Sequence, residues 1–509
     1  MIYEIDNFKI SPKDNLDEKV LTKYKTKKYK ILRRSIDARK KEDVKVIYKL
    51  AVDTPLNLKN EKKYIEEKIN LDYPKWNKKS PIVVGFGPAG IFASLYLARC
   101  GANPIIIERG STIEKRVECV NEFLNNKKLN PNSNVQFGEG GAGTFSDGKL
   151  TTNVKNPLIK FILNEFYIHG AHEDILYDAK PHIGTDVLRI VVENIRKEII
   201  SLGGTFYFDH QFLDVKKVGV DLEVYVSNLE PIITNDLLLC IGHSARDTIK
   251  HLYNNLNVEM EPKAFSMGVR VEHPTNLINE SQYGKFYKDL PPAYYNLACH
   301  LNGRGIYTFC MCPGGYVLAS ASEPNTIVTN GMSNNKRDNI NSNSAILVDV
   351  LPTDYYKNSV LDGLDYQEKY EKKAFEIAKD YRAPANLIKE FLNDDIAKDF
   401  RSVKTTYPHG VKFADLSRCL PDFVIEGLKG GIVEFDKKLK GFNYDDGILI
   451  GIESRSSSPV RIKRDENYET SIKGVYPVGE GAGYAGGITS AALDGLKVAM
   501  KIAKGVEND

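Results

Sequence analysis

The sequence lacks the cysteine density of a disulfide-stabilised secreted protein. Its 509 residues hold 7 cysteines, an odd number scattered along the chain from Cys100 to Cys419. A secretory signal is also missing, because no basic segment with an apolar core follows Met1. Both absences favour a reducing compartment, so we expect a cytoplasmic protein.

Strong net charge, low-complexity tracts and internal repeats are absent as well. The 70 Lys and Arg nearly balance the 67 Asp and Glu, which gives no sign of a nucleic-acid-binding protein or an acidic tail. A hydrophobic fraction of 42% is typical of globular proteins and excludes disorder of the whole chain. The charge is nevertheless uneven, since residues 1–80 hold 22 Lys and Arg against 13 Asp and Glu.

One apolar run is long enough to raise the question of a membrane span. Residues 81–98 carry no charge over 18 positions, which approaches the length of a transmembrane helix. Gly85, Gly87, Pro88 and Gly90 would break such a helix near its start. We therefore expect a protein that does not enter the membrane.

The length of the chain corresponds to about two to four domains. Residues 1–57 predict a small basic unit of ferredoxin-like type. Its expected elements are a strand over 1–10, a helix over 11–23 and strands over 29–37 and 44–52. Residues 58–80 are charged and weakly apolar, as expected of a linker that is partly helical.

Beyond residue 80, unalternating apolar runs predict a parallel sheet covered on both faces. These runs occupy residues 82–84, 105–107 and 237–242, with a helix over 88–100 after the first. The pattern indicates an α/β fold with a Rossmann-like domain, into which an α+β segment with mixed strands and helices is inserted.

The glycine-rich turn after the first of these strands carries the clearest chemical signal. Gly85 permits a tight turn, Gly87 lets backbone N–H groups approach a pyrophosphate, and Gly90 lets the helix pack closely on the strand. Glu108 ends the next strand, 18 residues after Gly90, where a carboxylate accepts ribose hydroxyls and repels a 2′-phosphate. The fingerprint therefore favours FAD or NAD over NADP.

Two further segments match the same glycine spacing without its context. Residues 138–143 lead into a loop, and residues 481–486 precede a helix but no second strand with a ribose-binding acid. Neither predicts a second nucleotide site, so both need another explanation.

Four segments carry a resemblance to a known family: the fingerprint with Glu108 and Arg109, and residues 134–150, 451–462 and 474–487. Together they resemble the FAD-dependent dehydrogenases, or NAD(P)/FAD-dependent oxidoreductases, of the glutathione-reductase-type flavoprotein superfamily. The resemblance implies a discontinuous FAD-binding domain over residues 81–261 and 441–509. A substrate domain over residues 262–440 would be inserted between the two parts.

The resemblance also implies which residues meet the FAD. Residues 140–148 would pass the flavin ring, Glu480 would lie near the ribityl or pyrophosphate region, and Arg109 and Arg116 would approach the adenosine or phosphate part. Phe212 and Gly242 would lie at the adenosine half. The full expected set is Gly85, Gly87, Pro88, Ala89, Gly90, Glu108, Arg109, Arg116, Gln136, Gly141, Gly143, Thr144, Ser146, Asp147, Gly148, Phe212, Gly242, Glu480, Gly486, Gly487, Ile488 and Thr489.

The sequence also departs from the disulfide reductases of that superfamily. No Cys-x₄-Cys pair follows the first crossover unit, and no separate NAD(P)H-binding domain is visible. The reductant is then the substrate itself or a nicotinamide that docks transiently beside the flavin.

No catalytic base stands out, and three polar residues are candidates. His182 and Asp186 precede a helix, where a helix cap with a satisfied histidine is the simpler interpretation. Lys149 either favours a reduced anionic ring or lies in solvent.

Cys310 and Cys312 would share one face of a strand. A structural turn is the favoured interpretation, ahead of a contact with the substrate pocket, and no metal site is expected because His300 is the only extra ligand nearby. His243 and His273 are solitary, and we expect them to be structural.

The sequence thus predicts an FAD-dependent oxidoreductase that moves a hydride between flavin N5 and an unidentified small organic molecule. Two alternatives stay open: an RNA-modifying flavoenzyme that uses the basic N-terminal unit, and a non-enzymatic flavin redox sensor. The basic run from Arg39 to Lys41 lacks an aromatic stacking signature, so nucleic acid is the less favoured partner. The substrate, the electron acceptor and the oligomeric state are left open.

Overall fold

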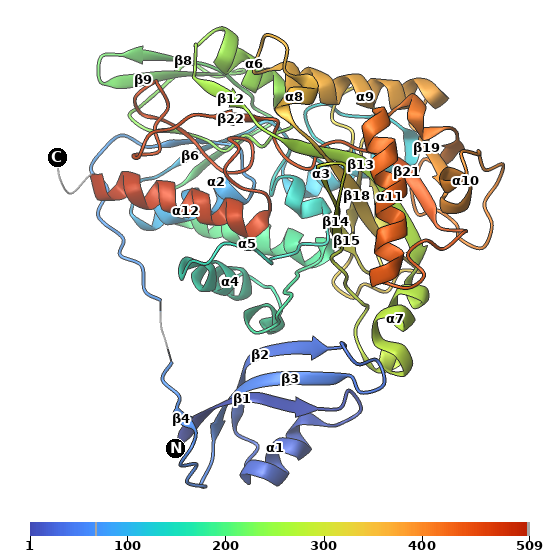
Figure 1. Cartoon of the computed structure of the whole chain (residues 1–509). Coiled ribbons are helices and arrows are strands. Elements are labelled where there is room, and N and C mark those ends of the chain that lie inside the picture. The colour runs from blue at the N-terminus through green and yellow to red at the C-terminus, as the bar shows by residue number, and fades with distance from the viewer. Residues whose placement is uncertain (67–68, 506–509) are drawn as a thin grey trace.

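The structure, a computed structural model, describes residues 1–66 and 69–505. A small N-terminal unit lies below a larger body in Figure 1, and the body is built around two sheets. The first sheet is parallel and has five strands, and the second is mixed and has seven.

The N-terminal unit has the strand–helix–strand–strand order expected from the sequence. Its elements are β1 (Ile2–Ile10), α1 (Leu16–Tyr24), β2 (Tyr29–Asp37) and β3 (Lys45–Asp53). They form an antiparallel sheet in the order β2-β3-β1-β4, in which β4 (Lys62–Lys63) comes from the predicted linker. Within the described part of that linker we find β4 but no helix, so the expectation of partial helicity is wrong there.

The parallel sheet has the strand order β23-β11-β5-β6-β7. Its strands are β5 (Ile82–Val84), β6 (Ile105–Glu108), β7 (Thr205–Phe208), β11 (Leu237–Leu239) and β23 (Val475–Pro477). Four of them precede residue 240 and the fifth comes from the C-terminal part of the chain, so two distant segments share one sheet.

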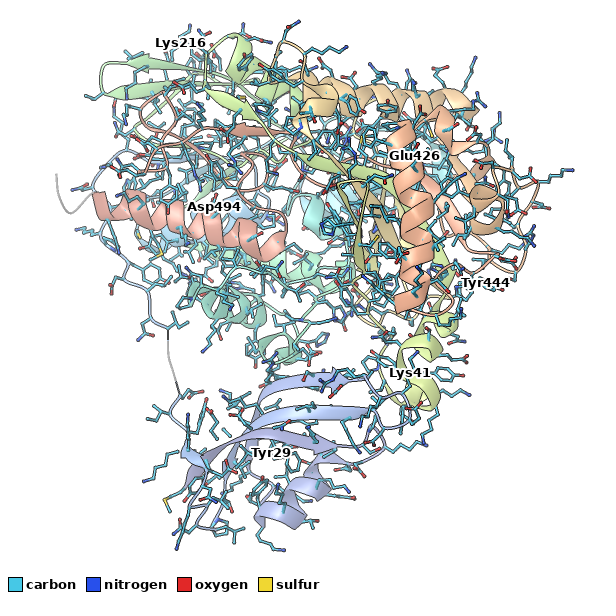
Figure 2. All side chains as sticks on the ribbon, viewed as in Figure 1. Tyr29, Lys41, Lys216, Glu426, Tyr444 and Asp494 are labelled. Atoms are coloured by element: carbon cyan, nitrogen blue, oxygen red, sulfur yellow. The ribbon has the colours of Figure 1, made fainter. Side chains whose placement is uncertain are left out.

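Helices cover this sheet because the faces they turn toward it are apolar. The covering helices include α2 (Pro88–Arg99), α4 (Leu158–Ile168), α5 (Thr185–Ser201), α6 (Arg246–Asn254) and α12 (Ile488–Gly505), whereas α3 (Ile113–Asn126) places Phe123 in the core of the inserted segment. α12 runs beside α2 (Figure 1), and an added Cβ at Gly495 would lie 2.1 Å from the Ala89 carbonyl oxygen. Asp494, labelled in Figure 2, accepts from the Gly479 N–H at 2.8 Å and ties α12 to the turn after β23.

A three-stranded meander continues from the parallel sheet. Its strands are β8 (Phe212–Val218), β9 (Asp221–Val226) and β10 (Ile232–Thr234), all antiparallel. The alternating burial of β9 shows that one face of the meander packs on the body while the other meets solvent.

The seven-stranded sheet has the order β14-β15-β18-β13-β21-β19-β20. Its strands are β13 (Phe265–Pro274), β14 (Ala298–Leu301), β15 (Arg304–Cys312), β18 (Asn341–Val350), β19 (Ala383–Leu387), β20 (Val411–Phe413) and β21 (Ile448–Glu453). Outside it lie β12 (Met260–Pro262) with β22 (Val460–Ile462), β16 (Tyr316–Ala319) with β17 (Thr329–Met332), and the helices α7 (Thr275–Tyr283), α8 (Pro352–Tyr355), α9 (Asp362–Ala378), α10 (Ile388–Leu392) and α11 (Asp422–Lys438).

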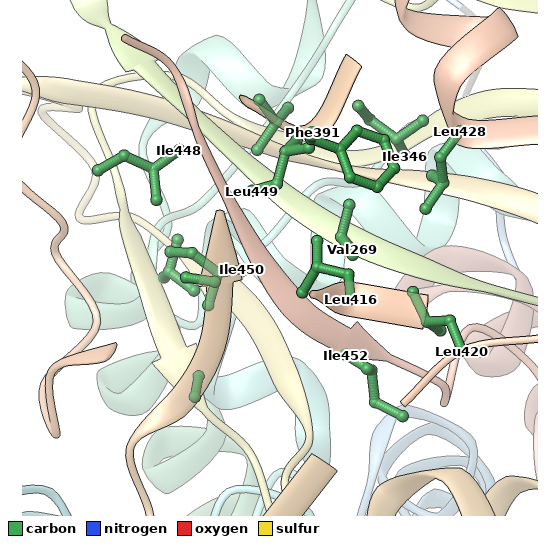
Figure 3. Packing of buried hydrophobic residues seen from close by; sticks show 14 of the residues in the cluster. Val269, Ile346, Phe391, Leu416, Leu420, Leu428, Ile448, Leu449, Ile450 and Ile452 are labelled. Atoms are coloured by element: carbon green, nitrogen blue, oxygen red, sulfur yellow. The ribbon is translucent and has the colours of Figure 1, made fainter. Parts of the chain in front are cut away.

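α11 packs closely against this sheet because two of its glycines face the strands. An added Cβ at Gly427 would lie 2.8 Å from Val348, and one at Gly431 would lie 2.6 Å from Ile306. Figure 3 shows the resulting core, in which Val269, Ile346 and Leu428 meet from different elements. Burying a side chain of this kind contributes about 1.5–3 kcal/mol.

The boundary expected at residue 440 differs from the structure. β21 lies beyond that boundary, yet it pairs with both β13 and β19 in the middle of the sheet. All six residues of β21 are buried, so the inserted sheet needs this strand to close its core. None of the helices in the described segments is both long and apolar enough to cross a membrane.

Candidate functional site

One large cavity lies at the carboxyl ends of the parallel strands, and its volume is about 470 Å³. Its walls come from the turns after β5, β6, β11 and β23, from residues 136–153, and from the seven-stranded sheet. The strand order reverses between β5 and β11, and ligands of open α/β sheets bind at such a point. The volume falls within the range of about 300–1,000 Å³ that is typical of small-molecule sites.

Two of the fingerprint glycines serve packing. Gly85 has φ +93°, and an added Cβ would lie 2.4 Å from the Cys240 carbonyl oxygen. An added Cβ at Gly90 would lie 1.9 Å from the Gly85 carbonyl oxygen, so α2 can approach β5 only with glycine there. Gly85 lines the cavity, whereas Gly90 does not.

Other glycines leave their backbones open to the cavity. An added Cβ at Gly87 would meet only the Cα of Gly141, at 3.6 Å. Gly242, Gly486 and Gly487 have no described atom within 4 Å of an added Cβ. Gly87 is also the N-cap of α2 and has no capping side chain, so backbone N–H groups at this helix start face the open space.

Glu108 lies in the cavity wall with most of its carboxylate already engaged. Oε2 accepts from the Phe86 N–H at 2.9 Å, and Oε1 accepts from Gly110 at 2.9 Å and from Gly138 at 3.0 Å. A carboxylate has about four acceptor positions, so one stays free for a ligand hydroxyl. The remaining contacts hold the loops of the cavity together.

Arg109 and Phe137 form a flat wall next to Glu108. The Arg109 guanidinium lies 4.6 Å from the centre of the Phe137 ring and donates to Asp247 at 2.8 Å. Phe137 was not among the expected residues, and its position directly before the glycines of 138–143 is the signal that could have pointed to it.

Arg116 does not match the expectation that it meets the adenosine or phosphate part. Its side chain is fully buried and donates to the carbonyls of Asn134, Val135, Gly138, Glu139 and Gly141. Arg116 therefore shapes the loop from beneath and is absent from the cavity wall. Burial lowers its pKa to about 10, which still leaves it charged at neutral pH.

Two expected hydroxyls are likewise turned away from the cavity. The Thr489 hydroxyl donates to the Leu150 carbonyl at 2.8 Å, and the Thr144 hydroxyl donates to the Glu139 carbonyl at 3.5 Å. The Thr144 carbonyl accepts from Thr185 at 2.6 Å. Both threonines are buried and connect helix starts to the loop. The other expected cofactor residues, apart from Gly90 and Arg116, all line the cavity.

Asp147 and Lys149 form a charged pair in the wall. Lys149 Nζ lies 3.2 Å from Asp147 Oδ2, and Arg337 donates to Asp147 from the other side, with Nε at 2.9 Å. Burial raises the pKa of Asp147, but Lys149 and Arg337 outweigh it and hold that pKa well below its usual range. The pKa of Lys149 is lowered by burial and raised more strongly by Asp147, so both groups stay charged.

The other two catalytic candidates lie outside the cavity wall. His182 Nε2 contacts the Asn335 carbonyl oxygen at 3.0 Å, and Asp186 accepts from the Asn335 N–H at 2.8 Å. Together they fix the turn that carries Arg337. Neither side chain lines the cavity, so the structure favours the simpler structural interpretation of both residues over a role in catalysis.

His243 was expected to be structural, yet it faces the cavity. Its Nδ1 lies 3.2 Å from Glu480 Oε1, and within the described chain Nε2 has no hydrogen-bond partner. A buried nitrogen without a partner is costly, so Nε2 is the nitrogen that a ligand could engage. Glu480 is partly exposed beside it.

The opposite wall belongs to the seven-stranded sheet and its loops. It is mostly polar and carries Tyr294, Asn296, Thr308, Phe309, Cys310 and Asn330. Apart from Cys310, none of these was expected, because they lie on strands and loops whose partner segments are far away in the sequence. The Cys-x-Cys pattern was the one available signal, and pocket contact was its second interpretation.

Comparison with known proteins shows which relatives the chain has. It is 45% identical over 530 residues to a protein of Clostridium beijerinckii described as uncharacterized, covering 99% of this chain and 98% of that protein. Residues 264–456 match the family model "FAD-dependent protein, C-terminal domain-like". The chain belongs to the same family as the Clostridium protein, and its residues 264–456 form a domain of the FAD-dependent C-terminal type. Residues 1–53 match a second model, which describes a domain of unknown function.

Several solved structures are similar to this chain at low identity and low TM-score. The halogenase PltM, in a mutant form with FAD, is 10% identical with a TM-score of 0.40. The match covers 85% of this chain and 70% of the halogenase chain, and the two percentages below are given in the same order. The tetracycline destructase Tet(51) is 11% identical with a TM-score of 0.36 and coverage of 85% and 82%. CtdE with FAD is 9% identical with a TM-score of 0.32 and coverage of 85% and 88%. At these values we draw no conclusion about activity.

FAD is the cofactor of this family, and the residues of the cavity fit it. The open glycine backbones leave room for a pyrophosphate, and Glu108 keeps one acceptor position at the end of β6. His243 Nε2, which has no partner within the described chain, adds a donor or acceptor in the same wall. When bound, FAD supplies the two-electron chemistry of its isoalloxazine ring.

Proposed function

We propose that this protein is an FAD-dependent oxidoreductase that moves a hydride between the flavin and a polar organic molecule. One observation carries the proposal: a single cavity joins the glycine backbones at the start of α2 to the polar wall of the inserted sheet. The first part suits a dinucleotide, and the second leaves room for a reactant beside it.

Several features support the dinucleotide part. The strand order, counted along the chain, is that of a doubly wound dinucleotide-binding sheet, and Glu108 ends its second strand. In this proposal the N–H groups at the start of α2 bind the pyrophosphate, and Glu108 accepts a ribose hydroxyl. Arg109 and Phe137 form the flat wall against which an adenine packs.

The start of α12 supports placing the flavin ring at the other end. α12 is 18 residues long, and Gly486, Gly487 and Ile488 at its start line the cavity. The positive end of a helix stabilises negative charge placed before it by about 0.3–1 kcal/mol. Lys149 and Arg337 together outnumber Asp147 by one charge in the same region, so the chain favours a ring that carries negative charge.

The inserted sheet defines the reactant. Its wall offers amide and hydroxyl groups from Asn296, Thr308 and Asn330, and the phenol of Tyr294. Lys180 Nζ lies 4.0 Å from the centre of the Tyr294 ring. We infer a substrate with hydrogen-bonding groups, with NADH or NADPH as a transient donor where the substrate is the acceptor.

The test begins with the purified full-length protein and its absorbance spectrum. We expect a flavin spectrum, and anaerobic mixing with NADH, NADPH or a candidate metabolite should bleach it with one of them. A flavin-containing protein that no organic donor reduces, and whose reduced form no organic acceptor reoxidises, would refute the oxidoreductase. A colourless protein that does not bind added FAD would refute the placement of the cofactor in this cavity.

A further inference from the structure

Two cysteines stand together in the wall of the cavity, on the last residues of β15. Cys310 lines the cavity and is partly exposed, whereas Cys312 is fully buried behind it. Cys310 has φ +44°, and the pairing of β15 with β18 breaks between Phe309 and Cys312. This kink brings the side chains of residues 310 and 312 together, although the intervening Met311 is buried in the core.

The two cysteines contact each other. The Cys312 thiol donates to the Cys310 carbonyl oxygen at 3.2 Å. Neither cysteine is in a disulfide in this structure. The cavity-facing sulfur therefore has a second sulfur directly behind it.

Positive groups surround this pair. Lys149 faces it across the cavity wall, and Arg270 donates to the Cys310 carbonyl oxygen at 2.7 Å. The negative groups nearby, Asp147 and Glu453, are ion-paired with Lys149 and Arg270 respectively. The interaction with Cys312, followed by these two cations, lowers the pKa of Cys310, while burial raises that of Cys312. A more acidic thiol facing the cavity with a less acidic thiol behind it is the arrangement of an attacking and a resolving cysteine.

We propose that Cys310 and Cys312 form a reversible dithiol–disulfide pair in the cavity wall, in which Cys310 attacks and Cys312 resolves. With a small disulfide such as glutathione disulfide, the Cys310 thiolate attacks one sulfur, forms a mixed disulfide and releases one glutathione thiolate. The Cys312 thiol then loses its proton and attacks Cys310 Sγ, which releases the second glutathione. The protein loses two hydrogens and the small disulfide becomes two thiols, so electrons and atoms balance.

This pair is a redox function separate from the proposed hydride transfer. The dithiol step needs only a small disulfide as oxidant, so it can be measured whether or not an organic donor reduces the flavin. Failure of one proposal therefore leaves the other standing.

The experiment uses the full-length protein as purified, treated with glutathione disulfide and digested with trypsin. Cleavage after Arg304 and Lys336 gives a peptide over 305–336 that holds both cysteines and no other. We expect this peptide to be lighter by two hydrogens and to regain them after reduction with dithiothreitol. In Cys312→Ser a glutathione adduct should accumulate on Cys310, and in Cys310→Ser neither product should form.

Cys119 supplies the matched control, because it is a partly exposed thiol on α3 outside the cavity wall. Cys119→Ser should leave the chemistry of 305–336 unchanged. Without any variant, iodoacetamide at neutral pH should alkylate Cys310 roughly ten-fold faster than Cys119, since ordinary thiols are only a few per cent ionised there. Equal rates, or a wild-type adduct on Cys310 that never converts to the internal disulfide, would overturn the proposal.

Discussion

At the scale of single residues, the glycines of the cavity separate into two groups with different physical roles. Gly85 and Gly90 allow backbone segments to touch, because an added Cβ would overlap a carbonyl oxygen. Gly87 and Gly487 have no such neighbour and leave space in front of their N–H groups. A side chain in the first group would disturb the fold, whereas one in the second would occupy the space of the ligand.

Gly87→Val tests this distinction. Gly87 has φ −81° and ψ −174°, which any L-residue adopts, so the fold should persist. The branched side chain would fill the place of the pyrophosphate, and we expect loss of bound FAD. The measurement is the ratio of flavin to protein absorbance, with thermal unfolding as a check on the fold.

Gly505→Ala is the matched control, because this glycine also has open space around an added Cβ but lies outside the cavity wall. It should keep the flavin ratio of the wild type. Full flavin retention in a folded Gly87→Val protein would contradict the placement of the pyrophosphate at the start of α2.

Lys149→Met tests the charge near the flavin. Asp147 would keep Arg337 as a partner, so the loop should hold its shape. Loss of the cation makes the reduced anionic ring less favourable, and we expect the two-electron reduction potential to fall by on the order of 30 mV, equivalent to about 1.4 kcal/mol. Lys155→Met, at an exposed position on the same segment, should leave the potential unchanged. An unchanged or higher potential in Lys149→Met would place the ring away from this cation.

At the scale of elements, the sequence predicted local patterns well and long-range pairing poorly. Short apolar runs placed β5, β6 and β11, and the glycine spacing placed the starts of α2 and α12. The position of β21 was missed because its partners, β13 and β19, come from parts of the chain far away. The same reason explains why the polar wall of the cavity, except for Cys310, could not be predicted.

A buried cluster of charges, also missed, joins three elements behind the cavity. Glu371 of α9 accepts from Arg246 of α6 at 2.7 Å and from Arg455, which follows β21, at 2.9 Å. Glu371 is fully buried and both arginines are nearly so. Arg455 also donates to Ser244, which lines the cavity. The cluster therefore links the cavity wall to the contact between α6, α9 and the end of β21.

Glu371→Gln should destabilise this joint. Two buried guanidinium groups would lose one of the two carboxylates that they share and keep only Glu323. Breaking a buried ion pair costs about 3–5 kcal/mol, so we expect a loss at or below the low end of this range. Denaturant unfolding measures the loss, and Glu376→Gln on the exposed face of the same helix should change the stability little. A Glu371→Gln protein as stable as the wild type would show that the Glu371 ion pairs make no net contribution to the free energy of unfolding.

The same carboxylate predicts how stability depends on acid. Burial raises the pKa of Glu371, but Arg246 and then Arg455 outweigh it, so the folded pKa lies well below the ordinary value of 4.5. Its contribution is therefore complete above about pH 4.5 and is lost as the pH falls toward the folded pKa. The stability difference between wild type and Glu371→Gln should shrink over that acidic range, and a difference that grows there would contradict this sign.

At the scale of the whole molecule, the N-terminal unit is a separate body with its own small core. Tyr3, Phe8, Val20 and Leu50 are among its buried residues. It contacts the larger body along β2, where Arg34 donates to Asp178 and exchanges backbone hydrogen bonds with residues 177–179. Its loop at Lys41, labelled in Figure 2, approaches Gly284 after α7.

Removing residues 1–66 tests what this unit is for. Trp76 stays in the shortened chain and packs in the core of the parallel sheet, and the cavity wall begins only at Val84. We therefore expect the shortened protein to bind FAD and to be reduced by the same donor as the full chain, within about two-fold in rate. Loss of FAD would show that the unit supports the cavity through its contact with residues 177–179.

RNA binding by the two forms decides the role of the basic charge. Nonspecific contacts with phosphates weaken steeply with salt, so affinity measured over a range of salt separates a true site from general attraction. Equal affinity of both forms, or none in either, would refute the RNA-modifying alternative. If RNA affinity is lost when residues 1–66 are removed while flavin reduction persists, the N-terminal unit has a role in recognition. The cavity would then work without the part of the molecule that binds the RNA.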